Sequence, residues 1–162
     1  MVTDPVAEVT RCLYDVMDPE IPFLNVMEMG MVREVVQDGD FIVIRITPTY
    51  SGCPATDVIA DDVLAAAKVI YPNSRTEIVR TPAWTTDWIG EEARLKMEKH
   101  GIAPPNGQSA DKTFLLGKGR ITPCPRCKST DTHLVSAFGS TACKAHFKCN
   151  ACLEPFDHFK CI

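Results

Sequence analysis

Two Cys-x-x-Cys pairs near the C-terminal end constrain the fold of this chain more than any other feature. The pairs are Cys124-Pro-Arg-Cys127 and Cys149-Asn-Ala-Cys152, and 21 residues separate them. Two residues between cysteines let one tight turn direct both sulfurs at the same metal ion, and two such turns complete a tetrahedral zinc site. The sequence therefore predicts one structural Zn²⁺ held by four thiolates.

Redox-active thiol pairs or disulfides are the alternative interpretation of the same four cysteines. The first residues, MVTDPVAEVTR, contain no basic segment followed by an apolar run, so we expect no secretion signal and a cytoplasmic location. Disulfide scaffolds belong mainly to exported proteins, whereas paired cysteines in an intracellular chain more often bind metal. Zinc is therefore the favoured interpretation.

The tail built around these cysteines has the pattern of a zinc ribbon. Residues 133–138 and 141–148 are the expected strands, and zinc supplies folding energy that so short a segment cannot gain from its own core. Cys143 lies six positions before Cys149, about 20 Å away along an extended strand, so we expect it to be a small buried residue and not a ligand. Cys161, next to the C-terminus, is expected to be mobile.

The first hundred residues predict a small α+β domain. A helix is expected from Pro5, strands over 32–36 and 41–47 around an Asp-Gly turn, a helix from Pro54, a strand over 76–81, and a helix ending at His100. This order indicates a three-stranded sheet covered by helices. Because residues 103–119 are rich in Pro, Gly and polar residues, we predict a domain over 1–102, a linker over 103–119 and the zinc ribbon over 120–162.

Charge is spread unevenly along the chain. Residues 1–119 carry eleven Lys/Arg and eighteen Asp/Glu, whereas residues 120–162 carry six and three. Four thiolates and one Zn²⁺ together add about two negative charges to the tail, so it is only weakly basic. With a pI of 5.5 for the whole chain, nucleic-acid binding is disfavoured. No stretch approaches the roughly 18 apolar residues that a membrane span needs, so we expect no membrane association.

Cys53 is the candidate functional residue of the first domain. It follows a polar loop, TPTYSGCP, and precedes the predicted start of a helix at Pro54. Unpaired N–H groups and the helix dipole favour a thiolate at such a place, and a thiolate can ligate iron or attack an electrophile. Thr49 and its neighbours add hydroxyl groups nearby. The alternative is an ordinary core cysteine.

Asp18 and Glu20 form a second candidate, a pair of carboxylates on either side of Pro19. Two neighbouring acids can perform general acid–base chemistry. The commoner role of such a sequence is to end a helix and form a turn, because the prolines at 19 and 22 cannot continue the helix. Both interpretations remain open from the sequence.

Several segments in a fixed order resemble a known family. DPEIP, MGMV, TPTYSGCP and PAWTTDWI resemble the small domain shared by cytosolic iron–sulfur targeting factors and SufT-like proteins. Together with the ribbon segments CPRC and FGSTACKAHFKCNACLEPFDHFKC, the whole chain resembles the PaaD family. These are accessory proteins of bacterial phenylacetate degradation, encoded with the multicomponent oxygenase that epoxidises phenylacetyl-CoA.

The resemblance implies a non-catalytic role in maturing or assembling that oxygenase through iron or iron–sulfur handling. It places Cys53 on the family's characteristic cysteine, and Asp18 and Glu20 on its acidic signature. One thiol per chain cannot hold a cluster, so a transient cluster or iron at Cys53 would need a second copy of the chain or ligands from a partner. The implied partners are therefore the protein components of the oxygenase and a second copy in a homodimer.

Two other functions remain as alternatives. The ribbon is suited to a nucleic-acid-binding or protein-docking module, and Cys53 is suited to a thiol-dependent enzyme, although no histidine is near it in the sequence. The chain lacks the Glu and Glu-x-x-His pairs of helical di-iron oxygenases, a G-x-G-x-x-G motif and a phosphate-binding loop. We therefore do not expect catalysis by the isolated chain.

Overall fold

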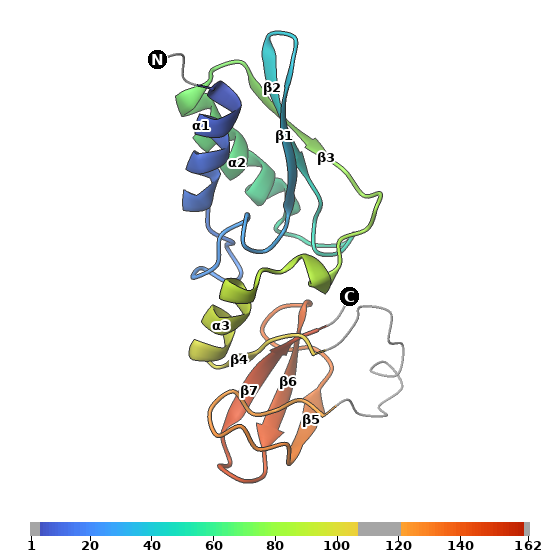
Figure 1. Cartoon of the computed structure of the whole chain (residues 1–162). Coiled ribbons are helices and arrows are strands. Elements are labelled where there is room, and N and C mark those ends of the chain that lie inside the picture. The colour runs from blue at the N-terminus through green and yellow to red at the C-terminus, as the bar shows by residue number, and fades with distance from the viewer. Residues whose placement is uncertain (1–3, 107–120, 161–162) are drawn as a thin grey trace. The chain divides into compact units, whose positions relative to one another are not determined.

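The computed structural model describes residues 4–106 and 121–160 (Figure 1). The chain forms two compact units, which we call the sheet unit (Met1–Trp84) and the ribbon unit (Thr85–Ile162). Among the described residues, no helix is both long enough and apolar enough to cross a membrane.

The sheet unit is a three-stranded sheet with two α-helices. β2 lies in the centre, antiparallel to β1 and parallel to β3, because α2 carries the chain back across the sheet between β2 and β3. α1 and α2 pack against each other and against the sheet (Figure 1), so the predicted α+β fold is confirmed. The elements are α1 (Pro5–Cys12), η1 (Leu13–Asp15), β1 (Val32–Asp38), β2 (Phe41–Ile46), α2 (Thr56–Ile70) and β3 (Ser74–Ile78).

Local sequence explains the start of α1 and the alternation along β2. Asp4 caps α1 by accepting a hydrogen bond from the Val6 N–H group at 3.0 Å, and Pro5 occupies a position where a missing N–H does no harm. Along β2, Ile42, Ile44 and Ile46 share one face because side chains alternate along a strand, and all three are fully buried, as is Val43 on the other face.

The opposite face of the sheet carries a row of charges. Arg45 on β2 is the register partner of Glu34 on β1 and of Glu77 on β3, and it forms ion pairs with both. Arg75 and Asp38 form a further pair at 2.8 Å. These charged side chains are partly exposed to solvent, although Val43 on the same face is fully buried, whereas the isoleucine face packs beneath the helices.

The ribbon unit contains two strands that the sequence did not predict. Its sheet has the order β4-β7-β6-β5, in which β4 runs parallel to β7 and the other neighbours are antiparallel. β4 escaped prediction because it has only two residues, and β7 because it begins with a proline and contains Asp157, two residue types that are depleted in strands. The elements are η2 (Thr86–Trp88), α3 (Glu91–Lys99), β4 (Ile102–Ala103), β5 (Thr132–Ser136), β6 (Lys144–Cys149) and β7 (Pro155–Phe159).

The division of the structure differs from the predicted domain limits. The prediction placed α3 in the first domain and began a linker at Ala103, whereas the structure places both in the ribbon unit. The reason is that Ala103 is 1 % exposed and packs in the same apolar cluster as Phe147 and Phe156. Most of the predicted linker lies in 107–120, outside the described residues.

Arg94 connects η2, α3 and the residues after β4 through hydrogen bonds to the backbone. Its guanidinium group donates hydrogen bonds to three backbone carbonyls: Thr86 at 2.6 Å, Pro105 at 2.7 Å and Ile89 at 3.4 Å. One planar, permanently charged side chain therefore holds together η2, α3 and the segment after β4.

We predict that Arg94→Ala destabilises this segment by about 2 kcal/mol, because three carbonyls lose a charged donor. Hydrogen exchange measured by mass spectrometry should become faster in α3 and β4 and stay unchanged in β1 and β2, which serve as the internal control. Arg94→Lys should recover only part of the protection, since an ammonium group lacks the fork geometry. Unchanged exchange in α3 would contradict this role.

Candidate functional site

Four cysteine sulfurs converge in the ribbon unit. The Sγ atoms of Cys124, Cys127, Cys149 and Cys152 all lie within 4.8 Å of one another. The Cys124–Cys152 and Cys127–Cys149 separations are 3.8 Å and 3.5 Å. A tetrahedral zinc with Zn–S bonds of about 2.3 Å places its sulfurs about 3.8 Å apart, so this donor set fits Zn²⁺ in both chemistry and spacing.

Each pair of cysteines lies in a tight turn of the same kind. In the first turn, the Lys128 N–H donates to the Cys124 carbonyl at 2.9 Å. In the second turn, the Cys152 N–H points at the Cys149 sulfur at 3.5 Å. The residue after each second cysteine has a left-handed backbone, with φ of 64° at Lys128 and 65° at Leu153. The two turns therefore repeat one geometry around one point.

Hydrogen bonding also favours the ligating form of Cys149. The backbone N–H of Cys152 stabilises the Cys149 thiolate and lowers the pKa of that thiol to about 7. The Glu154 N–H favours the thiolate of Cys152 in the same turn, but burial and the neighbouring thiols outweigh it and raise the pKa of Cys152 to about 12. Because a metal ligand must be deprotonated, the positive charge of a bound Zn²⁺ is what would let all four crowded thiols ionise together.

The remaining cysteine and histidine side chains of the tail have other contacts. Cys143 is 3 % exposed, its sulfur lies 3.0 Å from the Thr141 hydroxyl, and it is not one of the four clustered sulfurs. His146 contacts Asp157 at 3.3 Å, and His158 contacts the Ala103 carbonyl at 3.2 Å. Cys161 lies outside the described residues.

We predict one tightly held zinc per chain that depends on the four clustered cysteines. Cys149→Ser should release the metal and unfold the ribbon unit while the sheet unit stays folded, because each unit has its own core. Cys143→Ser is the matched control and should keep one equivalent. Zinc is measured by elemental analysis after gel filtration, and stoichiometric zinc in Cys149→Ser would show that the ligand set is different.

A second candidate site lies at one end of the sheet unit. β1 begins at this end of the sheet, and β2 and β3 finish there. Two backbone hydrogen bonds of 2.8 Å mark this end: the Thr47 N–H donates to the Met31 carbonyl, and the Val79 N–H donates to the Ile46 carbonyl. The loop before β1 and the loop before α2 therefore lie at the same end of the sheet (Figure 1). Those two loops contain the acidic pair and the cysteine selected from the sequence.

Cys53 lies in the turn that leads into α2. Its N–H donates to the Tyr50 carbonyl at 3.2 Å, and its carbonyl accepts from the Thr56 N–H at 3.2 Å and the Thr56 hydroxyl at 2.9 Å. α2 begins at Thr56 with Ala55 as its capping residue, so the predicted helix start at Pro54 is wrong. Cys53 thus precedes the cap by two residues. It is half-buried, and nearby Thr49 is 6 % exposed.

The Asp18 side chain stabilises the turn that contains the acidic pair by accepting backbone hydrogen bonds. Its carboxylate accepts the N–H groups of Glu20 at 2.7 Å and of Ile21 at 3.0 Å, and the residue is only 6 % exposed. This arrangement is an Asx-type turn, in which a carboxylate replaces a backbone acceptor. The geometry favours the turn-forming interpretation of Asp18, and Glu20 follows it half-buried.

A reciprocal pair of hydrogen bonds that was not predicted from the sequence shapes the next part of this loop. The Asn25 side chain accepts from the Glu28 N–H at 2.8 Å, and the Glu28 carboxylate accepts from the Asn25 N–H at 3.2 Å. The spacing Asn-x-x-Glu is the signal that would have revealed this reciprocal capping. Trp84 then donates its indole N–H to the Met29 carbonyl at 2.9 Å. Gly30, with φ of 65°, allows the chain to turn into β1.

We predict that Asp18→Ala lowers the free energy of unfolding of the sheet unit by about 2 kcal/mol, because two backbone donors lose a charged acceptor. Asp18→Asn keeps a side-chain oxygen and should lose less than half as much. Urea denaturation in a Trp88→Phe background lets Trp84 fluorescence report on this unit. Equal stability of all three proteins would show that the carboxylate does not hold the turn.

Two family models match different parts of the chain. Residues 6–79 match the model described as iron-sulfur cluster assembly protein, and residues 108–160 match the PaaD zinc beta ribbon domain. The first match falls within the sheet unit and the second within the ribbon unit. The segment between them includes η2, α3 and β4.

Relatives of known name match either the whole chain or its first part. A protein of Escherichia coli K12 named as a putative subunit of 1,2-phenylacetyl-CoA epoxidase is 46 % identical over 158 residues, which cover 97 % of this chain and 93 % of that protein. An Fe-S protein maturation auxiliary factor of Porphyromonas gingivalis is 32 % identical over 93 residues, covering 56 % and 88 %. The full-length relative thus carries both parts.

Solved structures match the sheet-unit fold. A domain of unknown function (DUF59) from Bacillus anthracis has a TM-score of 0.53 at 25 % identity, covering 57 % of this chain and 91 % of that one. A conserved hypothetical protein from Thermotoga maritima has a TM-score of 0.50 at 29 % identity, covering 59 % and 94 %. The fold of the sheet unit is therefore shared with these two solved structures.

Proposed function

Since this chain belongs to the PaaD family, we propose that it is an accessory protein that matures the multicomponent oxygenase that epoxidises phenylacetyl-CoA. The observation that carries the proposal is the relative named as an epoxidase component, whose similarity runs through both units of the chain. The match of the sheet unit to iron–sulfur assembly proteins supports iron or iron–sulfur handling as the kind of maturation.

The proposed working residue of the sheet unit is Cys53. Its thiol is half-buried, and the bonds to Tyr50 and Thr56 fix the backbone that presents it. A single thiolate supplies one ligand to an iron or iron–sulfur cargo, so the remaining ligands come from the client or from a second copy of the chain. Transfer then requires that client ligands replace the Cys53 thiolate of each copy of the chain that holds the cargo.

The proposed role of the ribbon unit is to recognise the client. Zinc bound by the four cysteines stabilises the two turns and the strands that follow them. Neither unit needs catalytic chemistry for this division of work, and it requires a compartment that keeps thiols reduced, which supports the cytoplasm as its location.

A thiol-dependent enzyme that uses Cys53 is less well supported. A nucleophilic cysteine usually needs a neighbouring base, most often histidine. All four histidines of the chain (His100, His133, His146 and His158) belong to the ribbon unit, so the sheet unit contains no imidazole to activate Cys53. The absence of that base favours a ligand role over a nucleophile role.

We predict that Cys53→Ala still binds the epoxidase components but leaves them deficient in iron and inactive. The measurement is iron content and epoxidation of phenylacetyl-CoA by a complex assembled anaerobically with each variant. Cys12→Ala is the matched control. The Cys12 sulfur lies 3.0 Å from the Val9 carbonyl of the same helix, and burial raises the pKa of this thiol. The control should support normal activity.

The same assay tests the ribbon unit. Cys149→Ser should weaken client binding, because the ribbon unit loses its metal, while the sheet unit keeps Cys53. Full oxygenase activity with Cys53→Ala would show that this thiol is structural and would overturn the mechanism. Normal client binding by Cys149→Ser would remove the ribbon from recognition.

A further inference from the structure

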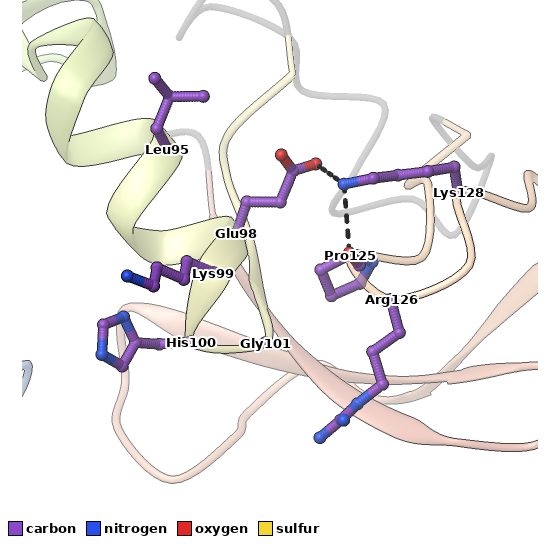
Figure 2. Close-up of a pocket in the computed structure, with 8 residues that line it drawn as sticks. All are labelled: Leu95, Glu98, Lys99, His100, Gly101, Pro125, Arg126 and Lys128. Carbon is purple, nitrogen blue, oxygen red and sulfur yellow. Dashed lines mark hydrogen bonds and ion pairs between the residues drawn. The ribbon is translucent and has the colours of Figure 1, made fainter.

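The ribbon unit has a polar cavity of about 420 Å³ between the C-terminal end of α3 and the first Cys-x-x-Cys turn (Figure 2). Lys99 and His100 line it from the helix, with their side chains directed away from the turn in Figure 2, and Arg126 and Lys128 line it from the turn. Glu98 is the carboxylate among them. With histidine neutral, the charged side chains that line the cavity carry a net charge of +2.

One ion pair crosses the cavity. Glu98 on α3 pairs with the Lys128 ammonium group, which also donates to the Pro125 carbonyl at 3.1 Å (Figure 2). The two charged side chains are 36 % and 59 % exposed, so the pair is open to solvent and to an incoming anion. A solvent-exposed pair of this kind contributes only about 0–1 kcal/mol, so another carboxylate can replace Glu98 at little cost.

The two cationic residues of the first cysteine turn, Arg126 and Lys128, adjoin the predicted metal ligands in the sequence. Arg126 stands between the ligands Cys124 and Cys127, and Lys128 follows the second ligand with φ of 64°. A left-handed backbone suits glycine, and a side chain there costs about 1–2 kcal/mol. The chain nevertheless has lysine at this position, and the left-handed turn directs its ammonium group across the cavity.

We propose that this cavity, which we call the basic pocket, binds a carboxylate-bearing segment of a partner protein and does so only when zinc holds the first turn. Arginine binds carboxylates through two parallel hydrogen bonds, Lys128 adds a second cation on the same turn, and Lys99 lines the pocket from α3. The identification of this partner with the oxygenase components rests on the proposed function.

Two features favour an acidic peptide over a nucleic acid. Residues 1–84 carry six Lys/Arg against thirteen Asp/Glu, so the chain lacks the overall basic charge typical of nucleic-acid-binding proteins. The pocket also has apolar side chains at its edge, with Leu95 61 % exposed on α3 and Pro125 on the turn. These suit the aliphatic parts of a peptide and not a sugar–phosphate chain.

The first experiment measures binding of a fluorescein-labelled hexaglutamate peptide to the zinc-loaded full chain by fluorescence anisotropy. Arg126→Glu should weaken binding about tenfold, because it replaces a guanidinium group that donates to carboxylates with a negative charge that repels the peptide. Lys148→Glu makes the same charge change at an exposed position of β6 outside the pocket and is the matched control. Equal weakening by both variants would show non-specific attraction and overturn the proposal.

Two further variants separate binding from structure. Glu98→Gln removes the internal competitor of Lys128 and should tighten hexaglutamate binding severalfold, whereas a purely structural ion pair predicts no gain. Lys128→Gly suits the left-handed backbone, so it should keep zinc and weaken binding. Removal of zinc with a chelator should abolish binding. Tighter binding of coenzyme A than of hexaglutamate would identify a phosphate site instead and overturn the proposal.

A client assay distinguishes failure of this inference from failure of the proposed function. Arg126→Glu keeps Cys53 and the four zinc ligands, so it should lose capture of the epoxidase components without losing zinc. Normal capture by Arg126→Glu would show that the basic pocket is not the client surface, whatever Cys53 does. Full maturation by Cys53→Ala would overturn the proposed function, and the hexaglutamate measurements would still decide whether the pocket binds carboxylates.

Discussion

The convergence of four cysteine sulfurs is the constraint on which the ribbon unit depends. Its apolar core is small: Phe147 stacks on Phe156 with ring centroids 5.8 Å apart, and His158 meets the Phe147 ring edge-on at 5.6 Å. Cys124 and Cys149 belong both to this core and to the group of four sulfurs. Metal binding and core packing are therefore coupled, because a change in the turn geometry displaces side chains from the core as well.

The chain extends this small ribbon with a helix and a strand from outside the matched zinc-ribbon segment. β4 adds a parallel strand beside β7, and α3 leads directly into β4 through His100 and Gly101, whose φ of 78° lets the helix end sharply. The addition buries Ala103 against the ribbon core. It also brings the end of α3 opposite the first cysteine turn, which creates the basic pocket.

In the sheet unit, the strand topology places two loops at the same end of the sheet. The crossover through α2 makes β2 and β3 parallel, so both strands end where β1 begins. The loops around Asp18 and Cys53 consequently reach the same end of the sheet, although 34 residues separate these two positions. The Asp18 turn is held by hydrogen bonds to its own carboxylate, whereas the Cys53 turn is joined to Thr56, the first residue of α2.

The sequence by itself determined those features whose physical cause is local. Pro5 after Asp4 starts a helix, the Asp-Gly step forms a hairpin turn, and two residues between cysteines bring each pair of sulfurs together; each signal acts within a few residues. Only the tertiary structure decided the features that join distant segments. β4 pairs Ile102 with Asp157, and the first cysteine turn meets α3 through Lys128 and Glu98. Neither has a local signal, because a two-residue strand and an exposed ion pair gain their stability only after the chain between them has folded.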